Sequence, residues 1–386
     1  MSEGANPTSK EELGGLEDSK FFGWICESKD CLGKMVWSRF KPKEWRETDV
    51  DIKVECCGIC MSDLSTATSG WGPTRYPICV GHEIVGKVVR VGKEVKNVSL
   101  GQRVGVGAQS GSCLACEECK KLNEPYCVKG QIGTYNGKYK DGSGLSQGGY
   151  SNYCRVPAHF AIPIPDSLES VVAAPMMCGG ITVYSPLKEN GCGTPGFERV
   201  GIVGIGGLGH FGLIFAKALG AKRILAVSHS NSKESLAREL GATDFLATAN
   251  SKGGEDGFKK HARSLDLLVV TNNNADMPIH KYLGLVRPKG KVIHVGLPED
   301  PVMPTPIGKL LATGAFLGGS MIGGTKLIRE MLELTAEQKL RPLVEVRSMA
   351  DANQTVLDMH AGKPRFRYVL VNQDHDLHQQ RGGPKL

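Results

Sequence analysis

A glycine-rich turn between a short apolar run and a helical pattern constrains the fold of this chain more than any other feature. Residues 200–203 are apolar and lead into a G-x-G-x-x-G turn. The turn consists of Gly204, Ile205, Gly206, Gly207, Leu208 and Gly209. Apolar side chains then recur at helical spacing as far as Leu219, and Gly220 can end the helix. A strand, a glycine turn and a helix in this order begin a doubly wound parallel sheet.

The same turn has the chemistry of a phosphate site. Its first glycine makes the turn, its second lets a pyrophosphate approach the backbone, and its third lets the helix pack against the strand. The first turn of the helix also offers unpaired N–H groups to phosphate. We therefore expect the turn to bind a dinucleotide, the alternative being a purely structural turn. The expected binding residues are Gly204, Gly206, Gly207, Leu208 and Gly209.

The end of the next strand indicates which dinucleotide binds. The predicted strand 223–227 ends at Ser228, where an NAD site carries a carboxylate for the ribose hydroxyls. Here the chain has Ser228 and His229, followed by Lys233. Hydroxyl donors and an ammonium attract a 2′-phosphate that a carboxylate would repel. The sequence thus favours NADP(H); these polar residues could also cap the next helix, with Asn231 and Glu234 as a capping pair.

The rest of this region alternates between strand and helix patterns. Residues 244–248, 266–271 and 291–295 read as strands, and 232–240 reads as a helix. This alternation predicts an α/β fold with a parallel sheet and crossover helices. The length of 386 residues predicts two domains. The net charge is +7, but no dense Lys/Arg run is present, which argues against a nucleic-acid partner. The apolar runs are too short to span a membrane, so we expect no membrane partner.

Four cysteines within fifteen residues predict a metal site. Their C-x2-C-x2-C spacing, followed after seven intervening residues by a fourth cysteine, lets the thiolates converge on one tetrahedral ion. The ligands are Cys113, Cys116, Cys119 and Cys127. The polar flanks favour zinc over an iron–sulfur cluster. The polar N-terminus has no signal-like apolar region, so we expect reduced thiols rather than disulfides, and a cytoplasmic location.

Three further segments contain residues that can bind a metal. They hold Cys60, Ser62 and Asp63 in the first, His82 and Glu83 in the second, and Cys178 in the third. Taken singly, each residue could be an ordinary core residue, and Cys57 with Cys60 could form a redox pair.

Together these segments resemble a known family. With Thr134-Tyr-Asn136 and Gly148-Gly-Tyr150, the set resembles the zinc-dependent medium-chain dehydrogenases, over residues 21–371. The resemblance is greatest to the cinnamyl-alcohol-dehydrogenase branch, which includes fungal NADP-dependent alcohol dehydrogenases. It implies a Rossmann sheet inserted in a mainly β, GroES-like catalytic domain. The implied boundaries are 19–178 for the catalytic domain, 179–322 for the dinucleotide domain, and 323–386 for the return and the C-terminal tail.

The resemblance also assigns roles to residues. It implies that Cys60, His82 and Cys178 hold a catalytic zinc, and that the four-cysteine lobe holds a structural one. Asp63 would orient His82, and Ser62 would pass a proton to or from the reacting oxygen. Glu83 would either reach the zinc when no substrate is bound or remain a buried carboxylate near it.

The implied activity is that of an NADP(H)-dependent alcohol dehydrogenase or aldehyde reductase, dimeric through a strand near residues 316–320. The substrate would be an aromatic or medium-chain aldehyde or alcohol. The family often has histidine where this chain has Met61 and Ser65, which leaves a reductase of conjugated C=C or iminium bonds as an alternative. A non-catalytic protein on this scaffold is a second alternative. Met61, Trp71 and Tyr76 are either pocket walls or core residues.

The ends of the chain are read as tails. Residues 1–18 and 374–386 are polar and lack a periodic apolar pattern. The last three residues, Pro-Lys-Leu, resemble a Ser-Lys-Leu peroxisomal address in only two positions.

Overall fold

The computed structural model describes residues 16–249, 251–273, 277–298 and 302–372. The expected C-terminal tail, with its Pro-Lys-Leu, lies outside these residues, as do residues 1–15 of the N-terminal tail. Residues 16–18 do not form a loose tail, because Arg155 donates to the carboxylate of Asp18 at 2.8 Å.

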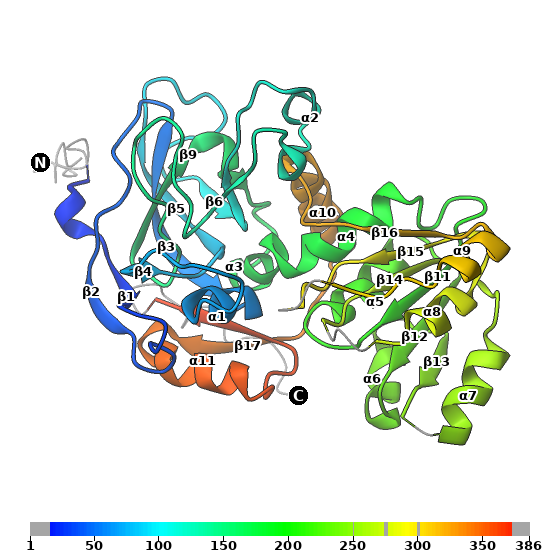
Figure 1. Cartoon of the computed structure of the whole chain (residues 1–386). Helices are drawn as coiled ribbons and strands as arrows, with labels where there is room; N and C mark the ends of the chain where they lie inside the picture. Colours follow the sequence, from blue (N-terminus) through cyan, green and yellow to red (C-terminus); the bar gives the residue numbers. More distant parts are fainter. Residues whose placement is uncertain (1–15, 250, 274–276, 299–301, 373–386) are drawn as a thin grey trace, which may run out of the picture.

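A six-stranded parallel sheet confirms the predicted α/β fold (Figure 1). Its strand order, β13-β12-β11-β14-β15-β16, is that of a dinucleotide-binding Rossmann sheet. Strand β14 is buried at every position, as expected for a central strand covered by helices on both faces. The elements are β11 (Arg199–Val203), α5 (Gly209–Ala218), β12 (Arg223–Ser228), α6 (Glu234–Glu239), β13 (Asp244–Ala247), α7 (Ser251–Lys260), β14 (Leu265–Val270), α8 (Ile279–Leu285), β15 (Val286–His294), α9 (Ile307–Thr313) and β16 (Phe316–Gly319).

Two elements differ from the sequence prediction. Strand β15 begins five residues before the predicted residue 291, because its pairing with β14 continues across an irregularity in the register. Residues 286–290 were not predicted as part of the strand, because Pro288 and Gly290 are typical of turns. The helix predicted at 232–240 is instead a 3-10 turn, η6 (Asn231–Lys233), followed by α6. Neither turn nor helix has a side-chain cap hydrogen bond, so the predicted capping pair of Asn231 and Glu234 is wrong.

The second body is mainly β. Its largest sheet has the order β10-β6-β5-β3-β18-β17, with β9 also paired to β3. Smaller sheets join β2-β1-β4 and β7-β8. The elements are β1 (Phe22–Cys26), β2 (Val36–Arg39), β3 (Asp49–Gly58), α1 (Met61–Ala67), β4 (Ile78–Cys79), β5 (Glu83–Val91), β6 (Arg103–Val106), β7 (Gln109–Gly111), α2 (Glu117–Lys120), β8 (Ile132–Gly133), β9 (Tyr153–Pro157), β10 (Ile162–Pro163), α3 (Ser170–Ala173), α4 (Gly179–Glu189), α10 (Thr325–Glu337), β17 (Val344–Ser348), α11 (Ala352–His360) and β18 (Arg367–Val371).

Helices α4 and α10 lie where the chain passes between the two bodies (Figure 1). The chain leaves the β body through α4 and returns through α10, after which β18 pairs with β3. One core cluster contains buried residues of α4, α10, α5 and β11, so the two bodies share a continuous apolar core. Within the described ranges no single helix is long and apolar enough to cross a membrane. The segments Ser170–Met177 and Gly179–Glu189 reach that length only together, and they bend by 62°.

One pair of cysteines departs from the expectation of reduced thiols. Cys26, at the end of β1, forms a disulfide with Cys31, across 5.2 Å between the two Cα atoms. The chain turns back within five residues, which brings the two thiols within the range that a disulfide can bridge. The other eleven cysteines are free.

Candidate active site and metal centres

Three segments bring two thiols and one imidazole together. Cys60 lies between β3 and α1, His82 lies between β4 and β5, and Cys178 directly precedes α4. Their ligand atoms and one carboxylate oxygen of Glu83 all lie within 4.8 Å of one another. All four residues are at least nine-tenths buried. The structure thus brings together the residues that the sequence predicted as catalytic zinc ligands.

The cluster has the electrostatics of a cation site. His82 Nε2 and Glu83 Oε2 are buried, and neither has a hydrogen-bond partner among the described residues. A hydrogen bond from Cys178 holds the pKa of the Cys60 thiol well below its ordinary value. Burial lowers the pKa of His82, but Asp63 and Cys60 outweigh it and raise that pKa to about 9. Two thiols and one imidazole that leave a fourth position open are a ligand set of catalytic zinc, so these residues fit that ion.

Asp63 binds the backbone around the cluster through hydrogen bonds, and its contact with His82 is longer. Its carboxylate accepts the N–H of Cys60 at 2.9 Å and that of Gly81 at 3.2 Å. The distance from Asp63 Oδ1 to His82 Nδ1 is 3.5 Å, which makes this an ion-pair contact rather than a short hydrogen bond. The position of Asp63 in the first turn of α1 therefore ties the two ligand segments together.

Two tyrosines complete this arrangement, and sequence reasoning gave neither of them a role. The hydroxyl of Tyr135 lies 2.8 Å from His82 Nδ1, and its ring stacks on the imidazole. The hydroxyl of Tyr150 donates to Asp63 Oδ2 at 2.8 Å. Both tyrosines lie in the Thr-Tyr-Asn and Gly-Gly-Tyr segments that contributed to the family resemblance. That resemblance was the only signal that could have identified them.

Arg367, in β18, links the cluster to the glycine turn. Its guanidinium forms an ion pair with Glu83 Oε1, an oxygen that also accepts the N–H of Gly179 at 3.3 Å. Arg367 also lies against the turn, because a Cβ added to Gly207 would be 3.1 Å from Arg367 Nη1. Sequence reasoning missed Arg367, since a single basic residue in a C-terminal apolar run carries no motif. Glu83 therefore has Oε1 in an ion pair, while its buried Oε2 has no hydrogen-bond partner among the described residues.

The remaining predicted residues of this site lie on α1 and just after it. Ser62 Oγ accepts from Cys60 Sγ at 3.4 Å, so its hydroxyl lies beside the cluster. Met61 and Trp71 are about two-fifths exposed and are not core residues. Tyr76 packs against the core and donates to the carbonyl of Ala67 at 2.6 Å.

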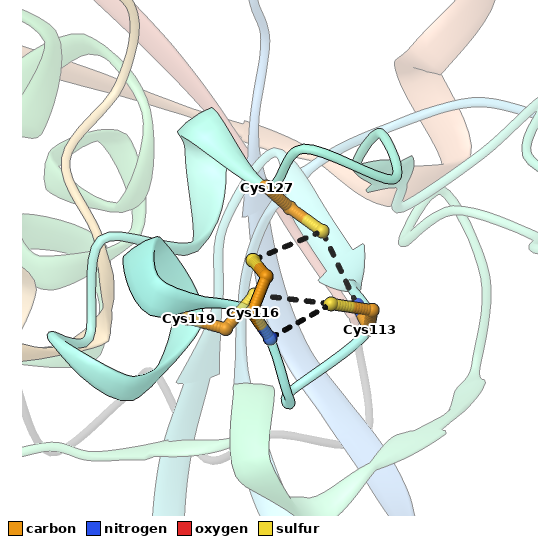
Figure 2. A group of neighbouring side chains, drawn as sticks. All are labelled: Cys113, Cys116, Cys119 and Cys127. Carbon is orange, nitrogen blue, oxygen red and sulfur yellow. Dashed lines mark hydrogen bonds between the residues drawn. The ribbon is translucent and has the colours of Figure 1, made fainter.

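The four cysteines of the lobe converge on one point (Figure 2). Their sulfur atoms lie within 4.8 Å of one another, and the Cys113–Cys119 and Cys116–Cys127 pairs are 3.9 and 4.0 Å apart. Tetrahedral Zn–S bonds of about 2.3 Å place the sulfur atoms about 3.8 Å apart. N–H groups of Ala115 and Cys116 lower the pKa of Cys113 to about 6, which favours its thiolate. The geometry fits one zinc ion and leaves no room for an iron–sulfur cluster.

The glycine turn has space on one side and tight contacts on the other. A Cβ on Gly209 would collide with the carbonyl of Gly204, as expected for the glycine at which helix and strand meet. Around Gly206, by contrast, no described atom lies within 4 Å of an added Cβ. Gly204 has φ +87° and Gly220 has φ +91°, so both turns require a left-handed backbone. The turn is therefore open at the position where a pyrophosphate would approach.

The residues predicted to select the cofactor lie beside this turn. Ser228 ends β12, and Lys233 donates through Nζ to the carbonyl of Ile205 at 2.7 Å. The Lys233 ammonium also lies 5.3 Å from the centre of the Phe366 ring. The backbone of His229 accepts the N–H of Ala249 at 2.8 Å. The structure brings Lys233 against the glycine turn.

Comparisons with known proteins match both bodies. Residues 46–166 match the alcohol dehydrogenase GroES-like domain, and residues 207–337 match the zinc-binding dehydrogenase domain. NADP-dependent alcohol dehydrogenase 6 of Saccharomyces cerevisiae is 39% identical over 93% of this chain and 98% of its own length. Cinnamyl alcohol dehydrogenase 2 of Arabidopsis thaliana is 39% identical over 92% of each chain.

Solved structures agree with these matches. A cinnamyl alcohol dehydrogenase from Sorghum bicolor superposes with a TM-score of 0.83 and 33% identity, covering 91% of this chain and 98% of that one. A cinnamyl alcohol dehydrogenase from Helicobacter pylori, solved with NADP(H), superposes with a TM-score of 0.81 and 31% identity. The match covers 91% of this chain and 97% of that one. The chain therefore belongs to the zinc-binding alcohol dehydrogenase family, in its cinnamyl-alcohol-dehydrogenase branch.

Proposed function

We propose that this protein is a zinc-dependent, NADP(H)-dependent alcohol dehydrogenase that acts as an aldehyde reductase on aromatic or medium-chain aldehydes. The observation that carries the proposal is the buried Cys60–His82–Cys178 cluster, which Arg367 connects to an open glycine turn. A metal-binding cluster can hold an ion that polarises a carbonyl, and a dinucleotide turn can hold the cofactor that supplies the hydride.

The chain's own residues would support this chemistry as follows. Cys60, His82 and Cys178 would hold zinc, while Tyr135 and Asp63 keep the imidazole in place. When bound, zinc supplies the Lewis acidity that polarises a carbonyl, and NADPH supplies the hydride. Ser62 Oγ would give a proton to the oxygen that was the carbonyl oxygen of the substrate. The reaction converts an aldehyde, NADPH and a proton into an alcohol and NADP⁺.

We assign the preference for NADP(H) to Ser228, His229 and Lys233. The ammonium of Lys233 already contacts the glycine turn, and Ser228 ends the neighbouring strand. These groups can donate to a 2′-phosphate. The Saccharomyces relative is named as NADP-dependent, which supports the assignment.

The organisation of the molecule forms part of the proposal. We assign residues 19–178 to the catalytic domain, 179–322 to the dinucleotide domain, and 323–386 to the return into the catalytic domain and the C-terminal tail, because β18 pairs with β3 while β11 to β16 form a separate sheet. We propose a homodimer formed through the exposed edge strand β16. A reducing compartment such as the cytoplasm would suit both thiolate clusters.

Product analysis tests the proposed function. The purified protein would be supplied with NADPH or NADH and with aliphatic, aromatic and conjugated aldehydes. We expect cinnamyl alcohol from cinnamaldehyde, with NADPH preferred. A saturated aldehyde as the product would instead show the alternative C=C reduction, which the named relatives do not favour.

A matched pair of cysteine variants tests the cluster. Cys60→Ser should lower turnover more than about a hundredfold, since loss of a direct ligand exceeds the effect of losing its supporting residues. Cys192→Ser is the control, because Cys192 is equally buried but lies outside both metal clusters. Full activity of Cys60→Ser would show that this cluster is not the active site.

A further inference from the structure

The four-cysteine lobe is tied to the segment through which the chain returns from the dinucleotide domain. Glu124, in the 3-10 turn η3 (Glu124–Tyr126), is completely buried and lies three residues before Cys127. Its carboxylate accepts the N–H of Thr325 at 3.0 Å and the hydroxyl of Thr325 at 2.8 Å. The hydroxyl of Tyr126 accepts the N–H of Met321 at 3.0 Å. The lobe therefore holds the residues immediately before α10 and the first residue of that helix.

The contact between lobe and return segment is close. A Cβ added to Gly324 would overlap the carbonyl of Leu122 and lie 2.7 Å from Glu124 Oε2. The carboxylate also contacts His159 Nε2 at 2.6 Å, which fixes it to the β body. Since no side chain fits between the two segments, a shift of the lobe must move the start of α10.

Helix α10 in turn packs on α4, and α4 begins directly after Cys178. Met331 of α10 is fully buried, and its sulfur would lie 3.2 Å from a Cβ added to Gly180. Ahead of α10, a Cβ added to Gly323 would lie 2.7 Å from Ile181. Within α4, the N–H and hydroxyl of Thr182 both donate to the carbonyl of Cys178, at 3.0 and 2.7 Å. The backbone of Cys178 is therefore anchored to the helix that α10 supports.

We propose that Glu124 is a positioning residue that connects the four-cysteine lobe to Cys178 through α10 and α4. In this arrangement the lobe does more than stabilise its own loop, because it keeps one ligand of the other cluster in place. The proposal rests on the proposed role of Cys178 as a metal ligand. It differs from a local role, in which Glu124 would only attach the lobe to the β body through His159.

Hydrogen exchange on the metal-loaded protein tests this connection. The variants are Thr325→Val, which removes one hydroxyl donor to Glu124 with little change in shape, and Glu124→Gln. The control is Glu118→Gln, whose carboxylate lies in the same lobe but accepts from Asn123 at 2.7 Å. We expect about tenfold faster exchange in Thr325→Val, both at the start of α10 and at residues 179–183, because a hydrogen bond to a charged group is lost. The control should match the wild type.

Zinc retention gives a second measurement that does not depend on activity. During chelation, Thr325→Val should lose the ion held by Cys60, His82 and Cys178 faster than the wild type, whereas Glu118→Gln should not. The proposal would be overturned if hydrogen exchange became faster at α10 while exchange at residues 179–183 and the rate of zinc loss stayed unchanged. Thr325→Val still allows this test if Glu124→Gln does not fold. Failure of the proposed function is distinguishable, because the Cys60→Ser enzyme would then keep its activity.

Discussion

At the scale of single residues, the clearest prediction concerns the hydroxyl of Tyr135. This hydroxyl is the nearest partner of His82 Nδ1, so Tyr135→Phe leaves that nitrogen without a short hydrogen bond. Loss of such a supporting partner typically costs 10- to 100-fold in metal affinity or activity. We expect a loss of this size in zinc affinity at the Cys60 cluster, measured by competition with a chelator, while the four-cysteine lobe keeps its ion.

Tyr139→Phe is the matched control for that variant. Tyr139 is also buried, but its hydroxyl donates to Ser110 at 3.0 Å. Equal zinc affinity in Tyr135→Phe and the wild type would mean that Asp63 alone orients the imidazole.

The candidate ligands and one supporting residue, Asp63, were predicted before the structure was known, but Tyr135, Tyr150 and Arg367 were not. The lobe cysteines have a spacing and flanking residues that point to metal chemistry, whereas Cys60, His82 and Cys178 were assigned through the family resemblance. Arg367 reaches the site from a strand 284 residues away from Glu83, and no local pattern marks such a contact. Such residues act through contacts between distant segments of the chain, so their identity becomes visible only when the tertiary structure is known.

At the scale of elements, an ion-pair network joins the N-terminal ends of β11, β14 and β15. Asp266 is buried and accepts from Arg199 and Arg287, both at 2.6 Å. Burial by itself raises the pKa of Asp266, but hydrogen bonds from the two arginines outweigh it and hold that pKa below its ordinary value. The charged carboxylate therefore stabilises the fold above about pH 4, the unfolded value, and this contribution is lost as the pH falls through the folded pKa.

Asp266→Asn should consequently destabilise the protein in a pH-dependent way. At pH 7 we expect the free energy of unfolding to fall by about 1–3 kcal/mol, less than for a fully buried pair because both arginines are partly exposed. The difference from the wild type should shrink below about pH 4, as measured by denaturant titration. Glu234→Gln, which breaks an exposed pair with Arg238, should change stability by less than about 0.5 kcal/mol. A difference that stays constant with pH would contradict this account of Asp266.

The elements themselves were largely predictable, with exceptions that have a physical cause. Strands β11, β12 and β14 each contain a run of at least four residues without a polar side chain, so their positions were predicted to within a residue or two. Strand β15 was predicted too short, because Pro288 and Gly290 are tolerated near its start, where the register with β14 is irregular. The Cys26–Cys31 disulfide was not expected, because it depends on a local reversal of the chain that spacing alone does not reveal.

At the scale of the whole molecule, the family resemblance implied that the dinucleotide domain is inserted in the catalytic domain, but it did not show which residues pack between the two. The dinucleotide fold follows from its own motifs and the catalytic fold from the family resemblance, whereas the shared core of α4, α10, α5 and β11 depends on packing between distant segments. The same limit applies to the surface. Edge strand β16 and the preceding helix α9 expose Phe316, Leu311 and Ile307, which are more than half accessible. Such an apolar edge is unusual for a monomer and suits pairing with a second copy.

Phe316→Lys should therefore weaken the proposed dimer. A lysine on an edge strand opposes strand pairing between molecules, because it brings a charge into the interface. Val346→Lys is a matched control, since β17 is the edge strand of the other large sheet and Val346 is 47% exposed. We expect light scattering after size exclusion to give the mass of a dimer for the wild type and for Val346→Lys, and a shift toward the 41.4 kDa monomer for Phe316→Lys. An unchanged dimer in Phe316→Lys would place the interface on another surface, and a monomeric wild type would remove the dimer from the proposal.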